Sequence, residues 1–381
     1  DRRTAGPPDR RTAGPPDRLA SPLVPVMRTR RDARRAHQRA AEEHNATTAL
    51  LALPGELLAH ILYCLPLAHD ISASSLTCKA LCAAARAVFQ LRPFTGTVVT
   101  LAAPHTKEEL NCVAAAPGNR IITGADKGIV NLWRDNTCVR TIDGHLAHVI
   151  AVAVLPGGQR FVSVSTDCTV KLWTLDGALE RTFNMGSVVL SVAALDADRF
   201  AVGGWQEVSL YHADGTRLKE LKGHTSSVNA LAATPDGQHI VSGGYDTLVN
   251  VWHVESGILV STSEPAGLVR AVAVMADGMR ILSGSDGGAV RLWTLGGTHQ
   301  KTFEGLHAQT VLALAALPDN VHALSAGNDI KLFNVDDGRV LRTFKHHTNT
   351  VSSLALMPDG LRFVSASYDR TARVVEIGRA M

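Results

Sequence analysis

The chain repeats itself from residue 95 to its end. A short strand-like segment that ends in Trp, or in a residue replacing it, recurs at intervals of 38 to 42 residues. Each repeat also carries an apolar run, a turn such as Pro235-Asp236-Gly237, and further β-branched runs. The repeat is therefore the structural unit, and every residue has to be interpreted by its place within it. The segments end at Trp133, Trp173, Tyr211, Trp252, Trp293, Phe333 and Val375.

Four short strands are predicted in each repeat. In period and strand number the repeats resemble those of the WD repeat family, in which each repeat forms one four-stranded blade of a β-propeller. The resemblance covers essentially all of residues 95–381. It implies a mainly β fold, a seven-bladed WD40 β-propeller.

The last blade needs a strand from elsewhere in the chain. Only six residues follow Val375, too few for a turn and a fourth strand. The segment Thr97–Leu101 has the pattern of a fourth strand, but no repeat precedes it. We expect this segment to complete the last blade, which closes the ring and removes a free strand edge.

A polar set recurs within the repeats at steps of 18, 4 and 6 residues. Ser, His and Asp together are the components of a hydrolase triad, but a nucleophile is needed once, and no Gly-x-Ser-x-Gly turn is present. These groups can instead hydrogen-bond to one another. The set resembles the structural tetrad of WD repeats. It comprises His145, Ser163, Asp167 and Trp173, then His224, Ser242, Asp246 and Trp252, and, with Val375 in the Trp place, His347, Ser365 and Asp369.

The remaining repeats depart from this set. The first has Lys127 in the Asp place, the fifth has Pro265 and Gly287 in the His and Asp places, and the sixth has a shorter hairpin around Asn328-Asp329. In the third, all four places are replaced. We hypothesise that the third blade is held by apolar packing alone and opens most easily. Its replacements are Phe183, Ala201, Trp205 and Tyr211.

Residues 50–94 are predicted to form three helices. Pro54 fits a first helical turn, a stripe of Leu and Ile follows, and Pro66 ends the run. With Thr77-Cys78-Lys79 at the matching distance, the segment resembles the F-box, which docks on the Skp-type adaptor of cullin-RING ubiquitin ligases. The alternative is a helical cap on the propeller. The resemblance places the adaptor-binding residues at Leu53, Pro54, Leu57, Leu58, Ile61, Leu62 and Leu65.

The first 49 residues are expected to be a disordered basic tail that begins with a tandem octapeptide. Residues 1–45 contain 11 basic and 6 acidic side chains, a charge of +5, which leaves −2 for the rest of the +3 chain. Because positive and negative charges are nearly balanced after residue 45, there is no electrostatic reason to expect a nucleic acid partner for this part of the chain.

In WD propellers, partner proteins usually bind on the face formed by the loops before the first strand and between the second and third strands. In F-box proteins with such propellers, two Arg on this face can bind phosphorylated targets, since Arg suits phosphate; the alternative is ordinary solvated Arg. An exposed Trp205 is a candidate hot spot, although filling the space left by the missing tetrad is equally plausible. The resemblance places the target-binding residues at Arg270, Arg370, Asn229, Trp205 and Lys127.

Together these features predict a non-catalytic substrate-recognition subunit of a Skp–cullin–F-box ubiquitin ligase. The alternative is a WD40 interaction scaffold, ubiquitin-binding or not, without ligase attachment. No catalytic residue, metal ligand set or cofactor site is expected, because the inner strands carry Val, Ala, Leu and Ile. The six Cys form no CxxC pair, and no run is long enough to span a membrane, so we expect a cytoplasmic or nuclear location.

Overall fold

The computed structural model describes residues 97–101 and 108–377. The predicted tail at 1–49 and the F-box-like segment at 50–94 lie outside the described residues, so the predictions made for them are not tested here. In the described part, 27 β-strands account for nearly all regular structure, and the single helical element is the 3₁₀ turn η2 (Asp126–Gly128). The mainly β class is confirmed.

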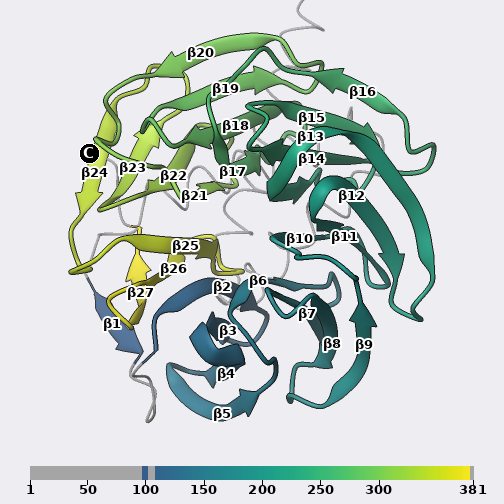
Figure 1. Cartoon of the computed structure of the whole chain (residues 1–381). Helices are drawn as coiled ribbons and strands as arrows, with labels where there is room; N and C mark the ends of the chain where they lie inside the picture. Colours follow the sequence, from purple (N-terminus) through teal and green to yellow (C-terminus); the bar gives the residue numbers. More distant parts are fainter. Residues whose placement is uncertain (1–96, 102–107, 378–381) are drawn as a thin grey trace, which may run out of the picture. The chain divides into compact units, whose positions relative to one another are not determined.

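Consecutive strands pair antiparallel in groups of four, which we call blades 1 to 7 in chain order (Figure 1). Blade 1 consists of β2 (Leu110–Ala116), β3 (Arg120–Ala125), β4 (Ile129–Arg134) and β5 (Thr137–Asp143). Blade 2 consists of β6 (Val149–Val154), β7 (Arg160–Ser165), β8 (Thr169–Thr174) and β9 (Leu179–Asn184). Blade 3 consists of β10 (Ser191–Ala194), β11 (Arg199–Gly203), β12 (Trp205–His212) and the first part of β13 (Arg217–Ala233).

Blade 4 consists of the second part of β13 with β14 (His239–Gly244), β15 (Val249–His253) and β16 (Leu259–Thr262). Blade 5 consists of β17 (Val269–Val274), β18 (Arg280–Ser285), β19 (Val290–Thr294) and β20 (His299–Phe303). Blade 6 consists of β21 (Ala313–Ala316), β22 (His322–Ala326), β23 (Ile330–Asn334) and β24 (Val340–Phe344). Blade 7 consists of β25 (Val351–Leu356), β26 (Arg362–Ser367), β27 (Ala372–Glu376) and β1 (Val98–Leu101).

The first strands of the blades surround a common centre, and each contacts the first strand of the next blade (Figure 1). β25 contacts β2, so blade 7 meets blade 1. There the Ser352 hydroxyl donates to the Leu110 carbonyl oxygen at 2.6 Å. β1 pairs antiparallel with β27, with Val98 opposite Val375, so the segment expected to close the ring occupies the outer place in blade 7.

The hydrophobic core is divided among the junctions between blades. Seven clusters of buried residues lie in the described part, and each joins two consecutive blades, including blade 7 to blade 1. In the cluster between blades 3 and 4, for example, Trp252 packs with Val208 and Leu221, all nearly free of solvent contact. Alternating strand residues supply these clusters because successive side chains of a strand point to opposite faces. Each repeat therefore depends on its neighbours for burial.

Candidate functional site

The tetrad of blade 2 forms one connected set of hydrogen bonds. The Trp173 indole N–H donates to Ser163 Oγ at 2.8 Å, and His145 Nε2 lies 2.7 Å from the same oxygen. His145 Nδ1 lies 3.1 Å from Asp167 Oδ2. Because an ionised carboxylate only accepts, Nδ1 carries the proton, and Nε2 accepts from the Ser163 hydroxyl. All four polar groups are thereby satisfied.

Blade 4 repeats this geometry. Trp252 Nε1 donates to Ser242 Oγ at 2.8 Å, and His224 lies 2.7 Å from that oxygen and 2.8 Å from the Asp246 carboxylate. Asp246 also accepts the backbone N–H of Thr225 at 2.9 Å. The carboxylate thus ties the part of β13 that joins blade 3 to blade 4 to the turn between the second and third strands. The tetrads fix the two loops that form one face of the blades.

Burial sets the ionisation of these groups. Burial lowers the pKa of His145, and the charge of Asp167 only partly opposes this shift. Burial raises the pKa of Asp167, but hydrogen bonds from the Thr169 hydroxyl and the Leu146 N–H outweigh it and bring the pKa to about 2. A neutral imidazole beside an ionised carboxylate is the state that the hydrogen bonds require.

Blade 6 retains more of the tetrad than the sequence analysis predicted. His307 Nε2 lies 2.8 Å from Ser325 Oγ, and its Nδ1 lies 3.2 Å from the Asp329 carboxylate. The steps of 18 and 4 residues were visible in the sequence, but Phe333 follows Asp329 after only four residues and hides the match. Blade 7 contains the same three groups, with His347 at 2.7 Å from Ser365 and 2.8 Å from Asp369.

Blades 1 and 5 retain a single Trp bond each in their described residues. Trp133 donates to the Thr123 hydroxyl at 3.1 Å, and Trp293 donates to Ser283 Oγ at 2.8 Å. In blade 1, Asp126 lies 2.6 Å from His148 Nδ1, which links its turn to the loop before β6.

Blade 3 replaces the polar tetrad by aromatic packing. Phe183, Phe200 and Tyr211 contact one another with ring centroids 5.4 to 5.9 Å apart. The assignment of Phe183 to the His place was wrong, because Phe183 pairs with Val170 inside the outer strand β9 of blade 2. The step of 18 residues does not hold in blade 3, where the turn between β10 and β11 has four residues and the corresponding turn of blade 2 has five.

The repeated Ser, His and Asp side chains have the geometry of a structural network. Ser163, Ser242 and Ser365 are fully buried, and in blades 2 and 4 the hydroxyl oxygen already accepts a Trp N–H. A substrate carbonyl has no access to them. Within residues 97–101 and 108–377, no three His, Cys, Asp or Glu side chains lie close enough to hold a metal ion. The same ranges contain no helix that is long and apolar enough to cross a membrane.

We call the face formed by the tetrad-held loops the loop face. Arg270, the second residue of β17, stacks over the Tyr245 ring at 4.5 Å and donates from Nε to Asp286 Oδ1 at 2.6 Å. Arg370 lies in the turn of blade 7 and is exposed, with no carboxylate of the described residues within ion-pair distance. One of the two predicted phosphate-binding Arg is therefore already neutralised by a carboxylate.

Two other predicted loop-face residues make local contacts. Lys127, in η2, is exposed and its Nζ lies 2.7 Å from Glu108 Oε1. Asn229, in β13, is half-buried and donates to the Ser227 carbonyl oxygen at 3.5 Å. Neither residue contacts Arg270 or Arg370 in the described structure. The predicted residues share a face but do not form one basic pocket.

Trp205 is 63% exposed at the start of β12. The alternative that it fills the space left by the missing tetrad is wrong, because a side chain in that space would be buried. Its exposure follows from a β-bulge between Trp205 and Glu207, where Gln206 has φ of 65° and donates to the Thr225 carbonyl oxygen. A bulge of this kind redirects a side chain. Leu146 and Val188, 95% and 43% exposed, lie in other loops of this face.

The WD domain, G-beta repeat family model matches four segments of the chain, residues 136–174, 215–253, 258–294 and 338–376. These segments coincide with most of blades 2, 4, 5 and 7. The chain contains a WD repeat domain. The matched repeats include the three with a complete His, Ser and Asp set at the predicted places, and also blade 5, which has Pro265 and Gly287 at the His and Asp places. The residues predicted to contact a Skp-type adaptor, Leu53 to Leu65, lie outside both the matches and the described structure.

Several curated proteins are similar to parts of the chain. Cilia- and flagella-associated protein 52 of Sus scrofa is 26% identical over 147 residues, which are 36% of this chain and 24% of that protein. Transcriptional corepressor LEUNIG_HOMOLOG of Arabidopsis thaliana is 28% identical over 144 residues, 37% of this chain and 17% of that protein. Eukaryotic translation initiation factor 3 subunit I of Drosophila ananassae is 27% identical over 179 residues, 41% of this chain and 56% of that protein. The matched length is thus a minor part of the first two relatives.

Proposed function

We propose that this WD repeat domain is a non-catalytic protein-interaction scaffold that binds a partner protein through the loop face. The observation that carries the proposal is Trp205, a large aromatic side chain exposed by a bulge that the backbone holds in place. Exposed Trp residues supply much of the binding energy at protein interfaces. The buried tetrads support the proposal because they hold the surrounding loops without providing a reactive group.

The proposal is tested by comparing two equally exposed apolar residues on opposite strand ends. Trp205→Ala removes the loop-face side chain, whereas Met279→Ala changes a residue that is 64% exposed in the turn before β18. Full-length protein carrying either change is used for affinity purification with quantitative mass spectrometry. Specific partners should be lost with Trp205→Ala and kept with Met279→Ala. Retention of every partner by Trp205→Ala, with an unchanged circular dichroism spectrum, would refute the proposal.

A second candidate is a receptor subunit of a Skp–cullin–F-box ubiquitin ligase, favoured by the Leu53-Pro54 start, the Leu and Ile stripe and Thr77-Cys78-Lys79. In this case the loop face binds the ubiquitination target. A pull-down with purified Skp-type adaptor tests it, comparing wild type with the double variant Leu57→Ala/Ile61→Ala. Binding lost in the variant supports the ligase attachment, and no binding by wild type excludes it.

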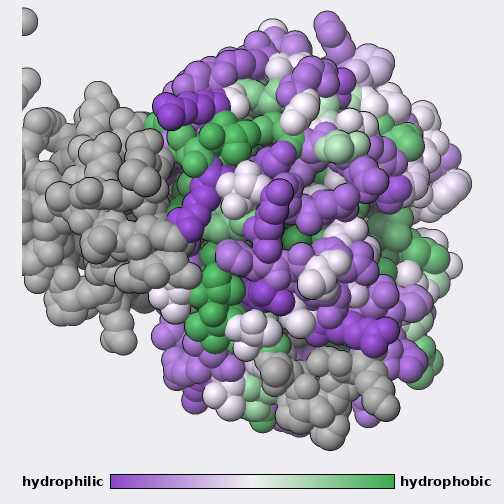
Figure 2. Space-filling model, turned by 90° about the vertical axis from the view of Figure 1, so that its left-hand side faces the viewer, coloured by the Kyte–Doolittle hydropathy of each residue, from purple (hydrophilic) through white to green (hydrophobic). Residues whose placement is uncertain are grey.

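Our proposal includes a cytoplasmic or nuclear location. The Cys residues of the described part, Cys112, Cys138 and Cys168, form no disulfide. Burial raises the pKa of the Cys112 thiol to about 12, so this Cys is unreactive. Free thiols are usual in reducing compartments. Figure 2 supports contact with an aqueous compartment on the side that it displays, where hydrophilic residues surround apolar patches of limited extent.

A further inference from the structure

Each blade begins its second strand with a basic residue on the face opposite the loop face. In β3, for example, Arg120 pairs with Arg134 of β4 at one strand end, and the η2 turn of the loop face lies at the other end. The equivalent residues are Arg120, Arg160, Arg199, His239, Arg280, His322 and Arg362. This sevenfold repetition allows each position to be compared with six internal controls.

The basic residues of the other blades have acidic neighbours. Arg280 Nε donates to Asp277 at 2.8 Å, and Arg362 Nε donates to Asp359 at 2.6 Å, in both cases within the turn before the strand. His322 Nδ1 likewise lies 2.6 Å from Asp319. Arg160 and Arg199 reach Asp198 and Asp196, at 2.5 and 2.6 Å, and Asp236 acts electrostatically on His239.

Arg120 is the exception among these seven. The turn before it contains no Asp, and the side chain of the preceding Asn119 is already bound to Asp135 and to Arg362. The described residues place no carboxylate within ion-pair distance of Arg120. Its cross-strand neighbour is a second Arg, Arg134, whereas the other blades have Thr, His, Asn or Glu at that place. Like charges directly opposite on paired strands are destabilising, so this arrangement calls for a counter-charge.

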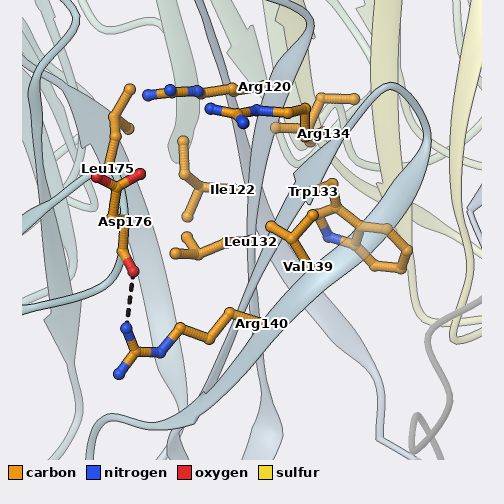
Figure 3. Close-up of a pocket in the computed structure, with 10 residues that line it drawn as sticks. Arg120, Ile122, Leu132, Trp133, Arg134, Val139, Arg140, Leu175 and Asp176 are labelled. Atoms are coloured by element: carbon orange, nitrogen blue, oxygen red, sulfur yellow. Dashed lines mark hydrogen bonds between the residues drawn. The ribbon is translucent and has the colours of Figure 1, made fainter.

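A pocket of about 230 Å³ lies beside these two Arg, between blades 1 and 2 (Figure 3). Figure 3 shows Arg120 and Arg134 together at one end, Arg140 at the other, and Leu132 between them. Arg140 donates to the backbone carbonyl of Asp176 at 2.8 Å, which leaves its charge uncompensated. Three Arg and the single carboxylate of Asp176 give the lining a charge of +2.

The floor of the same pocket is apolar. Ile122, Leu132 and Leu175 are buried beneath it, and Val139, on the outer strand β5, is 60% exposed at its rim. The pocket therefore offers an apolar contact and a cationic rim within one small volume.

Blades 3 and 4 contain a pocket at the equivalent place, of about 300 Å³, which serves as an internal control. There Arg199 corresponds to Arg120, and Lys219 to Arg140. Arg199 Nη1 donates to Glu255 Oε1 at 2.5 Å, and its Nε donates to Asp196. The carboxylates neutralise this second pocket. The two pockets occupy equivalent places, and the pocket of blades 1 and 2 differs by its net positive charge.

We infer that the pocket between blades 1 and 2 binds a peptide segment that carries an apolar side chain flanked by acidic groups. The apolar side chain covers the exposed Val139, while carboxylate or phosphate oxygens accept hydrogen bonds from the guanidinium groups of Arg120, Arg134 and Arg140. The inference concerns the face opposite the loop face and does not depend on the loop-face proposal.

The shape of the site favours a peptide over a nucleic acid. Nucleic acid surfaces require basic residues spaced along a stripe or groove. Here the equivalent basic residues of the other blades have acidic neighbours, so they do not extend the pocket into a basic stripe. The aromatic residue of the lining, Trp133, is buried and its indole N–H is bonded to Thr123, so it offers no free ring face on which a base could stack.

The test uses two fluorescein-labelled peptides and the full-length protein. Both peptides contain one leucine between pairs of acidic residues, which are aspartate in the first and phosphoserine in the second. Their affinities are measured by fluorescence anisotropy, which also distinguishes carboxylate from phosphate as the preferred group. A photoreactive leucine analogue in the peptide identifies the contact site by mass spectrometry. An oligothymidylate of equal charge is the comparison ligand.

Arg134→Gln and Arg140→Gln should each weaken peptide binding about fivefold, the expected loss for one charge-assisted hydrogen bond at a partly exposed site. The matched control, Lys219→Gln, and the loop-face variant Trp205→Ala should leave it unchanged. The photoreactive leucine should label β4 or β5. The inference is overturned if neither peptide binds, if the Arg variants bind as wild type does, if labelling occurs elsewhere, or if only the oligothymidylate binds.

A stability measurement adds an independent readout. Arg120→Gln should not lower the melting temperature, because Arg120 has no ion pair to lose and faces Arg134. Arg280→Gln should lower it, because Arg280 is bound to Asp277 and to the Asn320 carbonyl oxygen. An equal loss of stability in both variants would show that Arg120 has a structural role, and it would contradict the inference.

Discussion

Ser242→Ala tests whether the buried tetrads hold the blades together. The Ser242 hydroxyl is fully buried and contacts both Trp252 Nε1, at 2.8 Å, and His224 Nε2, at 2.7 Å. Alanine leaves both buried nitrogen atoms without a partner. Each unsatisfied buried group costs about 1–3 kcal/mol, so the substitution should lower the free energy of unfolding by about 2–6 kcal/mol.

Two other blades supply matched comparisons. Ser283→Ala in blade 5 removes the partner of Trp293 only, because Pro265 occupies the His place. Ser325→Ala in blade 6 removes the partner of His307 only, because Phe333 occupies the Trp place. Each of these should cost about 1–3 kcal/mol, roughly half of the Ser242→Ala effect.

Urea unfolding followed by tryptophan fluorescence and far-ultraviolet circular dichroism measures the three variants under one set of conditions. Ser187→Ala, at an exposed position in the loop before β10, is the control for the loss of a hydroxyl from the surface. The expected order of destabilisation is Ser242→Ala above Ser283→Ala and Ser325→Ala, with Ser187→Ala near zero. If Ser242→Ala costs no more than Ser283→Ala, the His–Ser contact does not stabilise the blade, and the reasoning fails.

Three further predictions concern local opening, pH and backbone space. Hydrogen exchange should be faster for the amides of β11 than for those of β14, since blade 3 lacks the polar tetrad; equal protection would contradict this. Burial lowers the pKa of His145, His307 and His347 below the usual 6.5, so the unfolded chain binds more protons than the folded chain does. The free energy of unfolding should therefore fall as the pH drops below about 6.5. Urea midpoints that stay constant or rise as the pH is lowered from 8 to 5 would contradict this prediction. Gly128→Ala should destabilise more than Gly118→Ala in thermal unfolding. Both residues have positive φ, at a cost of about 1–2 kcal/mol for Ala, but a Cβ at Gly128 would collide with the His145 carbonyl oxygen, while Gly118 has open space around it. Equal melting temperatures of the two variants would show that the loop at Gly128 accommodates a Cβ, and would contradict this prediction.

Sequence reasoning succeeded where a residue acts through its place in the repeat. The steps of 18, 4 and 6 residues predicted which His, Ser, Asp and Trp side chains meet in blades 2 and 4, because strand pairing brings equal steps to equal places. It failed at Phe183, because a shorter turn between β10 and β11 shifted the count, and it overlooked His307, Ser325 and Asp329 because the last step differs.

The loop-face residues show a different limit. Arg270 was predicted to be available for an anion, yet Asp286, sixteen residues further along the chain, neutralises it. The contact between Arg270 and Asp286 depends on the pairing of β17 with β18 and on the Tyr245 ring of the preceding blade. The exposure of Trp205 likewise depends on a bulge that no repeat pattern contains.

The amino-acid sequence by itself therefore determined the repeat, the class of fold, the segment that closes the last blade, and the hydrogen-bonded sets that recur at constant steps. These features follow from the periodicity of the amino-acid sequence. Only the tertiary structure decided which charges remain unpaired. Arg120 and Arg199 occupy the same place in their repeats, but Glu255 from the next blade neutralises Arg199, while Arg134 of the same blade faces Arg120. Charge compensation depends on distances between blades, and the periodicity of the sequence does not specify those distances.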